Sequence, residues 1–216
     1  MTLAHLHTPK HWLSGLPADH TGPRIALIHG FLAGTHMQRH LLRWVRAQGY
    51  ADSSLFSNHA NIGPIADWLQ EAVAQGRPIA LIGFSQGGFQ VLKVAQEMTR
   101  RQLSVQLVVS IARGGAGWLL PAQWRFRHQI SHTNIKHLLN IYSYADRLGT
   151  NPFVAGNALP EQPSMLVENI ALPRTLAIDH ISLVRCYPEN RVHPAVSGQV
   201  LAPIANALAK LSSGDD

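Results

Sequence analysis

One serine of the chain stands where a nucleophile is expected. Gly83-Phe84-Ser85-Gln86-Gly87 matches the pattern G-x-S-x-G and lies between an apolar run and a helical pattern. In that context the serine occupies a sharp strand-to-helix turn, where side chains at the two glycine positions would collide. The start of the helix directs backbone N–H groups at a developing negative charge. The sequence therefore predicts that Ser85 is a catalytic nucleophile rather than part of a turn that only packs helix on strand.

Short apolar runs alternate with helical patterns along the chain. Strands are expected at residues 24–28, 50–56, 78–82, 105–111, 138–144 and 174–178. Apolar residues at helical spacing predict helices around 37–45, 65–74, 91–98 and 196–211, the last kinked or begun near Pro203. This alternation predicts an α/β fold with a mostly parallel sheet of about six strands, flanked by helices. Reactive groups collect at the carboxyl ends of the strands in such sheets.

Size and charge limit the classes of function. The 216 residues suffice for one domain, expected at 24–216 after an N-terminal segment, 1–23. Charged residues make up only 14% and apolar ones 46%, which favours an apolar surface suited to lipid-like substrates. The net charge of +6 is scattered and forms no basic stripe, so no nucleic-acid partner is expected. Attraction to anionic substrates or to a membrane surface fits this charge equally well.

Other chemistries lack their signatures. Cys186 is the single cysteine, which excludes an intramolecular disulfide and a cysteine-based metal site. Histidines gather at positions 5, 7 and 11 and at 128 and 132 without carboxylate or thiol partners, so no metal is expected. Phosphate-loop and dinucleotide patterns are absent, so no cofactor is expected. Residues 1–23 do not resemble a signal peptide, and no apolar run could span a bilayer, so the expected location is the cytoplasm.

From Arg24 to about Leu211 the chain resembles the α/β-hydrolase superfamily, specifically its compact esterase and lipase members. The residues that carry the resemblance are His29-Gly30-Phe31 after the first strand, Gly83 to Gly88 at the turn, Asp146 after a late strand and His180 after the last. The resemblance implies the α/β-hydrolase fold and a catalytic triad whose members follow the chain order serine, acid, histidine. The chain departs from many lipases at residues 111–115, where they carry a Pro-His pair.

The resemblance assigns the acid to Asp146 and the base to His180, which would activate Ser85. The segment around His180 is similar to the His-x-Ser-Leu found around the base in many lipases. His193 is the alternative base, and Asp179 and Glu168 are the alternative acids. Asp179 is poorly placed, because adjacent residues rarely aim their side chains together. Asp146 could instead cap a turn or pair with Arg147.

An oxyanion hole needs two backbone N–H groups aimed at the reacting carbonyl oxygen. Gln86 supplies one through its position after the nucleophile, and the resemblance assigns the other to Phe31. The irregular section 113–136 exceeds a normal connection and is expected to form a small cap insertion. Within it, Trp118, Leu119 and Trp124 are expected to line an acyl pocket or face a lipid surface, or else only to anchor the loop.

Together these features predict a serine hydrolase that cleaves a carboxylic ester or lipid acyl ester through a Ser85–His180–Asp146 triad and an acyl-enzyme. Its partner is expected to be a small-molecule or lipid acyl substrate, and contact with a membrane surface is compatible with the composition. An acyl thioesterase with the same triad is one alternative. A non-catalytic α/β-hydrolase-fold binding protein is the other.

Overall fold

The computed structural model describes residues 20–113, 133–149 and 163–213. Its centre is a sheet built from β1 Arg24–Ile28, β2 Ser53–Phe56, β3 Ile79–Phe84, β4 Val105–Ile111, β5 Ile135–Ser143 and β6 Leu166–Leu172. The strands lie in the order β2-β1-β3-β4-β5-β6, and every neighbouring pair is parallel. All strands therefore end at one edge of the sheet, the carboxyl edge, and begin at the opposite amino edge. The predicted six-stranded α/β fold is confirmed.

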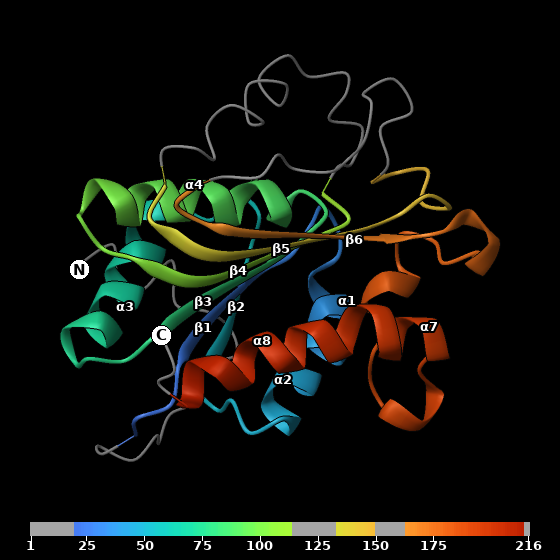
Figure 1. Ribbon diagram of the computed structural model, residues 1–216, viewed down its shortest axis with the longest axis horizontal. Helices are drawn as coiled ribbons and strands as arrows, with labels where there is room; N and C mark the ends of the chain where they lie inside the picture. Colours follow the sequence, from blue (N-terminus) through green and yellow to red (C-terminus); the bar gives the residue numbers. More distant parts are fainter. Residues whose placement is uncertain (1–19, 114–132, 150–162, 214–216) are drawn as a thin grey trace.

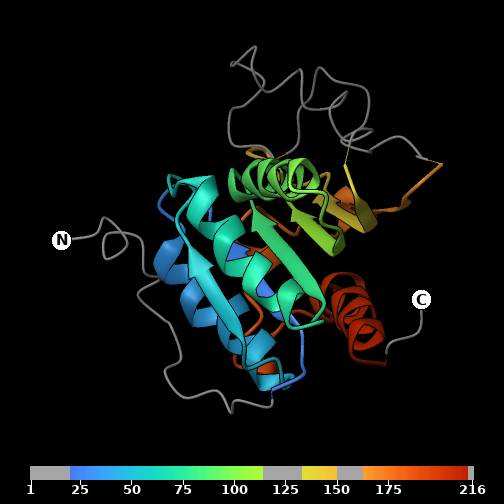
Figure 2. The ribbon, with the colours of Figure 1, turned by 90° about the vertical axis from the view of Figure 1, so that its left-hand side faces the viewer.

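Helices cover both faces of the sheet (Figure 1, Figure 2). One face packs against α3 Ile62–Ala74 and α4 Gly87–Arg100, and the other against α1 Gly34–Met37, η2 Gln38–Leu42, α2 Arg43–Ala47, η8 Ser197–Leu201 and α8 Ala202–Ser213. Short turns η5 Arg174–Leu176, η6 Ser182–Val184, η7 Glu189–Arg191 and α7 Pro194–Val196 follow β6. Among the described residues, none of the helices is long and apolar enough to span a membrane.

The apolar runs of the sequence reflect burial of the sheet on both faces. In β1, Ile25 and Leu27 pack into the core beneath α2 and α8, while Ala26 and Ile28 pack into the core beneath α3 and α4. Successive side chains of a strand point to opposite faces, so a strand covered on both faces has no face turned to solvent and is mostly apolar. This is why the interior strands could be found from the sequence.

The last strand of the sequence prediction is wrong. Residues 174–176 form the 3₁₀ turn η5, and the sixth strand is β6, Leu166–Leu172. β6 lies at the edge of the sheet and buries only Leu172. Because most of its side chains meet solvent, it carries polar residues and lacks the continuous apolar run of an interior strand. Pro173 follows directly and has no N–H with which to extend the ladder.

Other boundaries differ less. β5 begins at Ile135, before the predicted residue 138, so the expected cap 113–136 includes the start of a strand. β2 is shorter than the predicted 50–56 and begins at Ser53. The terminal helix changes from the π-helical η8 to α8 directly before Pro203, where the predicted kink falls. Proline has no N–H to donate to the preceding turn, which accounts for irregular helix there.

A buried carboxylate joins three strands at the amino edge. Asp52, which precedes β2, accepts a hydrogen bond from Arg24 Nε of β1 at 2.9 Å. It accepts a second from Arg77 Nη2, before β3, at 2.5 Å. The three side chains are at most 10% exposed. Arg24 also donates to the carbonyl oxygen of Trp68 in α3 at 2.6 Å.

Replacing Asp52 with Asn is expected to lower the free energy of unfolding by about 3–5 kcal/mol, because it removes the buried counter-charge of Arg77 and leaves Arg24 with only the exposed Glu71. Urea unfolding followed by circular dichroism measures the change. Glu71→Gln is the matched control, since Glu71 contacts the same Arg24 at 3.3 Å with 66% of its side chain exposed. The control is expected to cost at most about 1 kcal/mol. Equal losses in the two variants would contradict the role given to burial.

Candidate active site

The chain turns from β3 into α4 at Ser85. The backbone of Ser85 has a φ of 57°, in the left-handed region that costs a non-glycine residue roughly 1–2 kcal/mol. Its N–H donates to the carbonyl oxygen of Ile111 at the end of β4, at 2.9 Å. The residue is 6% exposed. The turn thus holds the hydroxyl at the carboxyl edge, directly before the N-terminus of α4.

Two glycines let the backbone on either side of Ser85 pack at very short range. A Cβ on Gly83 would overlap the carbonyl oxygen of Gly87 and lie 2.8 Å from the Cα of Gly88. A Cβ on Gly87 would overlap the carbonyl oxygen of Ile28 at the end of β1. Any side chain at these positions would push α4 away from β1 and β3, and with it the serine.

Asp146 and His180 meet at the same edge. Asp146 follows β5 and is 1% exposed, and its Oδ2 lies 2.7 Å from His180 Nδ1. Its Oδ1 accepts hydrogen bonds from the N–H groups of Leu148 and Gly149, each at 2.8 Å. A buried carboxylate with three donors is satisfied and held in one orientation. Sequence reasoning gave no indication of the Leu148 and Gly149 contacts.

The hydrogen bond to Asp146 fixes the tautomer of His180. An ionised carboxylate only accepts hydrogen bonds, so Nδ1 must carry the proton that bridges the pair. In the neutral ring, Nε2 then has a free lone pair and can accept a proton. This is the form that a general base requires.

His180 lies beside the serine turn. Its ring centroid is 4.7 Å from that of Phe84, the residue before Ser85. Ser85 Oγ has no hydrogen-bond partner among the described residues, so the bond from serine to histidine is not formed in this structure. Such bonds are often long without substrate and tighten when it binds.

The loop after β1 reaches the serine from the other side. A Cβ on Gly30 would lie 2.6 Å from Ser85 Cβ and 3.0 Å from Oγ, so only glycine fits. The next residues form an exposed turn in which Leu32 has a φ of 55°. Within the described part of the chain, the N–H groups of Phe31 and Gln86 have no acceptor. Both are therefore available to an incoming oxygen.

The other candidates from the sequence have different positions. His193 is the N-cap of α7, where its Nδ1 accepts from Ala195 N–H at 3.1 Å. Asp179 accepts from Ser182 N–H at 2.8 Å, and Glu168 contacts His137 at 2.6 Å toward the amino edge. The structure thus brings Asp146 to His180, and neither Asp179 nor Glu168. Trp118, Leu119 and Trp124 lie outside the described residues.

Exposed apolar side chains surround the carboxyl edge. Phe31 and Leu32 follow β1, and Tyr144 and Leu148 follow β5. Each is between 44% and 87% exposed. Exposed large apolar side chains mark a binding surface where they form a contiguous patch. The sequence analysis missed three of them, Leu32, Tyr144 and Leu148, because isolated apolar residues in loops follow no period.

Some groups can be set aside as reactive centres. Burial raises the pKa of the Cys186 thiol to about 12, which keeps it protonated and unreactive at neutral pH. The described residues contain no cluster of three or more metal-ligating side chains.

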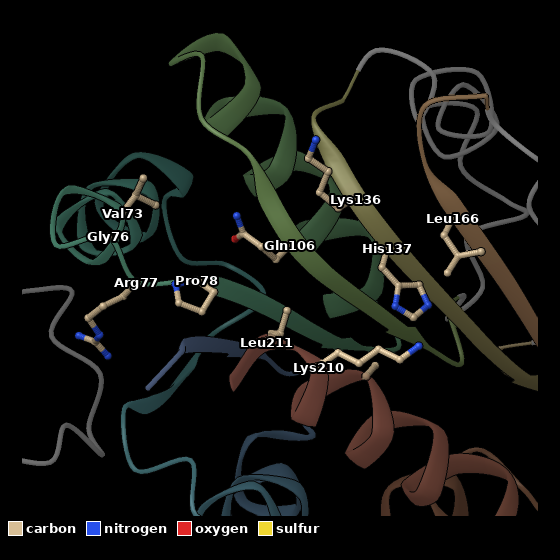
Figure 3. A pocket seen from close by; sticks show the side chains of 11 residues that line it. Val73, Gly76, Arg77, Pro78, Gln106, Lys136, His137, Leu166, Lys210 and Leu211 are labelled. Carbon is tan, nitrogen blue, oxygen red and sulfur yellow. The ribbon is translucent and has the colours of Figure 1, made fainter. Parts of the chain in front are cut away.

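A cavity of about 520 Å³ lies at the amino edge, away from Ser85, and is lined by residues such as Gln106, His137 and Leu166 (Figure 3). Of its charged side chains, Arg77 and Lys136 point in different directions.

A pair of histidines packs against the segment that follows His180. The rings of His36 and His40 lie 4.4 Å apart, and His40 Nδ1 accepts a hydrogen bond from Tyr187 N–H at 3.3 Å. Burial lowers the pKa of both imidazoles, and the charge of Arg185 lowers each further. The charge of His40 adds to the effect on His36, and that of Arg39 to the effect on His40. The folded protein therefore favours two neutral rings.

No protein-family model matches the chain, and neither does any curated protein. Solved structures do match. Human thioesterase 2 is 13% identical, with a TM-score of 0.51 over 88% of this chain and 97% of its own. An esterase/lipase from an uncultured bacterium is 13% identical, with a TM-score of 0.54 over 91% and 78%. A protein of unknown function from Agrobacterium tumefaciens, provisionally described as an α/β hydrolase, is 15% identical, with a TM-score of 0.52 over 93% and 90%.

These likenesses extend over most of each chain. They agree with the six-stranded parallel sheet flanked by helices. The chain has the α/β-hydrolase fold.

Gly149→Ala tests the position of the Asp146 carboxylate. A Cβ at this residue would overlap Asp146 Oδ2 and lie 2.8 Å from the carbonyl oxygen of Ala112. The variant is expected to lose about 1–3 kcal/mol of stability, as overpacked sites do. It should also lose the downfield proton resonance of the Asp146–His180 hydrogen bond, measured by NMR. Gly198→Ala is the control, because nothing lies within 4 Å of its Cβ position. A retained downfield resonance in Gly149→Ala would contradict the crowding.

The histidine pair predicts a loss of stability in acid. Because the folded pKa values lie below the ordinary value of about 6.5, the unfolded chain binds protons first as the pH falls. The contribution of the pair to the free energy of unfolding is complete above the unfolded pKa of about 6.5. It is lost as the pH falls from there toward the folded pKa values. His40→Gln should flatten the fall in unfolding free energy between pH 7.5 and pH 5, measured by urea unfolding at each pH. An unchanged slope would argue against the pair.

Proposed function

We propose that the protein is a serine hydrolase that cleaves carboxylic acyl esters through Ser85, His180 and Asp146. The observation that carries the proposal is the buried Asp146–His180 hydrogen bond of 2.7 Å, next to a serine held at a φ of 57°. A strained serine, a histidine in the basic tautomer and a buried carboxylate are the parts of an acyl-transfer site. The α/β-hydrolase fold supports the same conclusion only by analogy, since folds host many functions.

The reaction follows from the positions of these groups. Ser85 Oγ attacks the acyl carbonyl carbon while His180 Nε2 takes its proton, and Asp146 stabilises the imidazolium that forms. The carbonyl oxygen becomes an oxyanion, to which the N–H groups of Phe31 and Gln86 donate. Collapse expels the alcohol, which receives the proton from His180. Water then attacks the acyl-enzyme by the same route, releasing the carboxylic acid and restoring Ser85.

The exposed apolar side chains bear on the substrate. Phe31, Leu32, Tyr144 and Leu148 lie in the loops that follow β1 and β5, the loops that also carry Phe31 N–H and Asp146. An apolar rim at the reacting centre favours substrates whose acyl chain is apolar and disfavours those with charged acyl groups. The same apolar side chains are compatible with contact to a lipid surface, and such contact is part of the proposed function.

Thioester cleavage is the second candidate. The same groups would expel a thiol instead of an alcohol, and the thiol is the better leaving group. The observation that favours this reading is the similarity to human thioesterase 2, although 13% identity carries only the fold. The carboxylic ester remains the first choice, because neither the three proposed catalytic residues nor the exposed apolar side chains include a feature that is specific for a thiol leaving group.

Labelling with a fluorophosphonate probe tests the nucleophile. The adduct should appear on Ser85 by peptide mass spectrometry, and it should be absent in Ser85→Ala and His180→Ala. Turnover of p-nitrophenyl esters and matched thioesters of increasing acyl length would then distinguish esterase from thioesterase. No labelling of the folded wild-type protein would refute the proposal and leave a binding function.

Asp146→Asn is expected to lower kcat by about 10⁴-fold, the loss seen when the base of another triad takes the wrong tautomer. The new amide would keep its oxygen on the Leu148 and Gly149 N–H groups, so its NH₂ would face His180 Nδ1. The ring would then carry its proton on Nε2 and could not accept one from Ser85. Asp179→Asn is the control, because it neighbours His180 but bonds to Ser182. Similar losses in the two variants would argue against Asp146 as the acid.

A further inference from the structure

Asn58 contacts the residue that follows the nucleophile. It lies in the loop after β2 and is 4% exposed. Its side-chain Nδ2 donates a hydrogen bond of 2.6 Å to Oε1 of Gln86. A buried amide whose short bond joins two separate segments is a constraint on both of them.

The contact is one side of a closed ring of hydrogen bonds. Gln90 Nε2, on the first turns of α4, donates to the backbone carbonyl oxygen of Asn58 at 2.7 Å. Gln90 N–H in turn donates to the carbonyl oxygen of Gln86 at 3.2 Å. Asn58, Gln86 and Gln90 are therefore linked pairwise, and the β2 loop is tied to the start of α4 at two points.

The ring restrains Gln86, whose backbone N–H takes part in the proposed chemistry. The N–H of Gln86 has no acceptor among the described residues, and in the proposed mechanism it donates to the oxyanion. An oxyanion donor is effective only if its direction is set before the reaction, since reorientation during the reaction costs energy. The carbonyl oxygen of the same peptide, that of Ser85, accepts from Gly88 N–H at 3.0 Å, so the ring is a second restraint on that direction, added through the Gln86 side chain.

We propose that Asn58 is a positioning residue that holds the Gln86 N–H in the direction of the developing oxyanion. This inference rests on the proposed function and adds a residue that contacts neither substrate nor reacting atoms. The sequence gives no hint of it, because Asn58 stands in a loop, far from Ser85 along the chain. The competing explanation is that Asn58 only fastens the β2 loop to α4 and contributes stability alone.

Asn58→Ala separates the two explanations. With p-nitrophenyl butyrate, kcat is expected to fall by about tenfold or more, and by no more than the roughly 10²–10³-fold that loss of one oxyanion donor costs. KM is expected to stay within about twofold, because the donor acts in the transition state rather than in substrate binding. A purely structural role would lower the melting temperature and leave kcat of the folded enzyme unchanged, which would overturn the inference.

Asn61→Ala is the matched control. Asn61 is an asparagine of the same loop, and its side chain caps α3 by accepting from Gly63 N–H at 3.1 Å. Its removal should lower the melting temperature through loss of a helix cap, with kcat unchanged. The pair of variants therefore compares two structural asparagines, only one of which touches Gln86.

A double-mutant cycle completes the test. Gln86→Ala removes the same hydrogen bond from the other side and keeps the backbone N–H, so it should lower kcat by a similar factor. The double variant should be no worse than either single one, because both act through one bond. Additive losses would overturn the inference. If Asn58→Ala does not fold, Gln86→Ala alone gives the kcat-against-KM comparison, and an unchanged kcat there would equally refute it.

The outcome also distinguishes this inference from the proposed function. Fluorophosphonate labelling of the wild-type Ser85 is measured first. Absence of labelling would refute the proposed function and this inference with it. Labelled, active wild type together with an unaffected Asn58→Ala would refute the positioning role alone and leave the hydrolase standing.

Discussion

The close backbone contact between the start of α4 and the end of β1 is the constraint on which the site depends. Gly87 lies so near the carbonyl group of Ile28 that no side chain fits between them. This contact brings the N-terminus of α4 down onto the sheet, so Ser85 takes its left-handed backbone and its hydroxyl faces the carboxyl edge. The Gly30 loop can then approach Ser85 from the side of β1. The positions of the proposed nucleophile and of both candidate oxyanion donors thus depend on the same close backbone contact.

The second half of the site depends on a fully satisfied carboxylate. Asp146 sits at the end of β5, two strands away from Ser85, and its two oxygens divide their tasks. Oδ1 is bound to the chain by two backbone N–H groups, and Oδ2 holds His180. Because Gly149 leaves no room for a Cβ beside Oδ2, the turn that supplies these donors also requires a glycine. Glycines therefore set the geometry both at the turn after β3, through Gly87, and at the turn after β5, through Gly149.

The interior of the fold could be predicted, and Ser85, Asp146 and His180 could be named as candidates for a triad, because buried strands and the serine turn follow regular rules. Strands buried on both faces appear as unbroken apolar runs, and the turn around Ser85 needs glycines at fixed spacing. β6 could not be found in this way, since an exposed edge strand such as Leu166–Leu172 has no such run. Asn58 and the N–H partners of Asp146 were missed for another reason. Their roles depend on contacts between distant segments, and nothing in their local sequence records these contacts.

The strained turn at Ser85 and the buried Asp52 ion pairs lie at opposite edges of the sheet. Three of the non-glycine residues with positive φ, Leu32, Ser85 and Ala112, follow β1, β3 and β4 at the carboxyl edge, whereas Gln102 follows α4 and Ala177 follows η5. The amino edge instead holds the buried Asp52 with Arg24 and Arg77, which joins the starts of β1, β2 and β3. Strained conformations persist only where surrounding structure determines them, and here the same strands are fixed at their other ends. A parallel sheet makes this division natural, because every strand begins at one edge and ends at the other. Stability can therefore be concentrated at the starts of the strands while the ends keep the strained geometry that the proposed serine nucleophile requires.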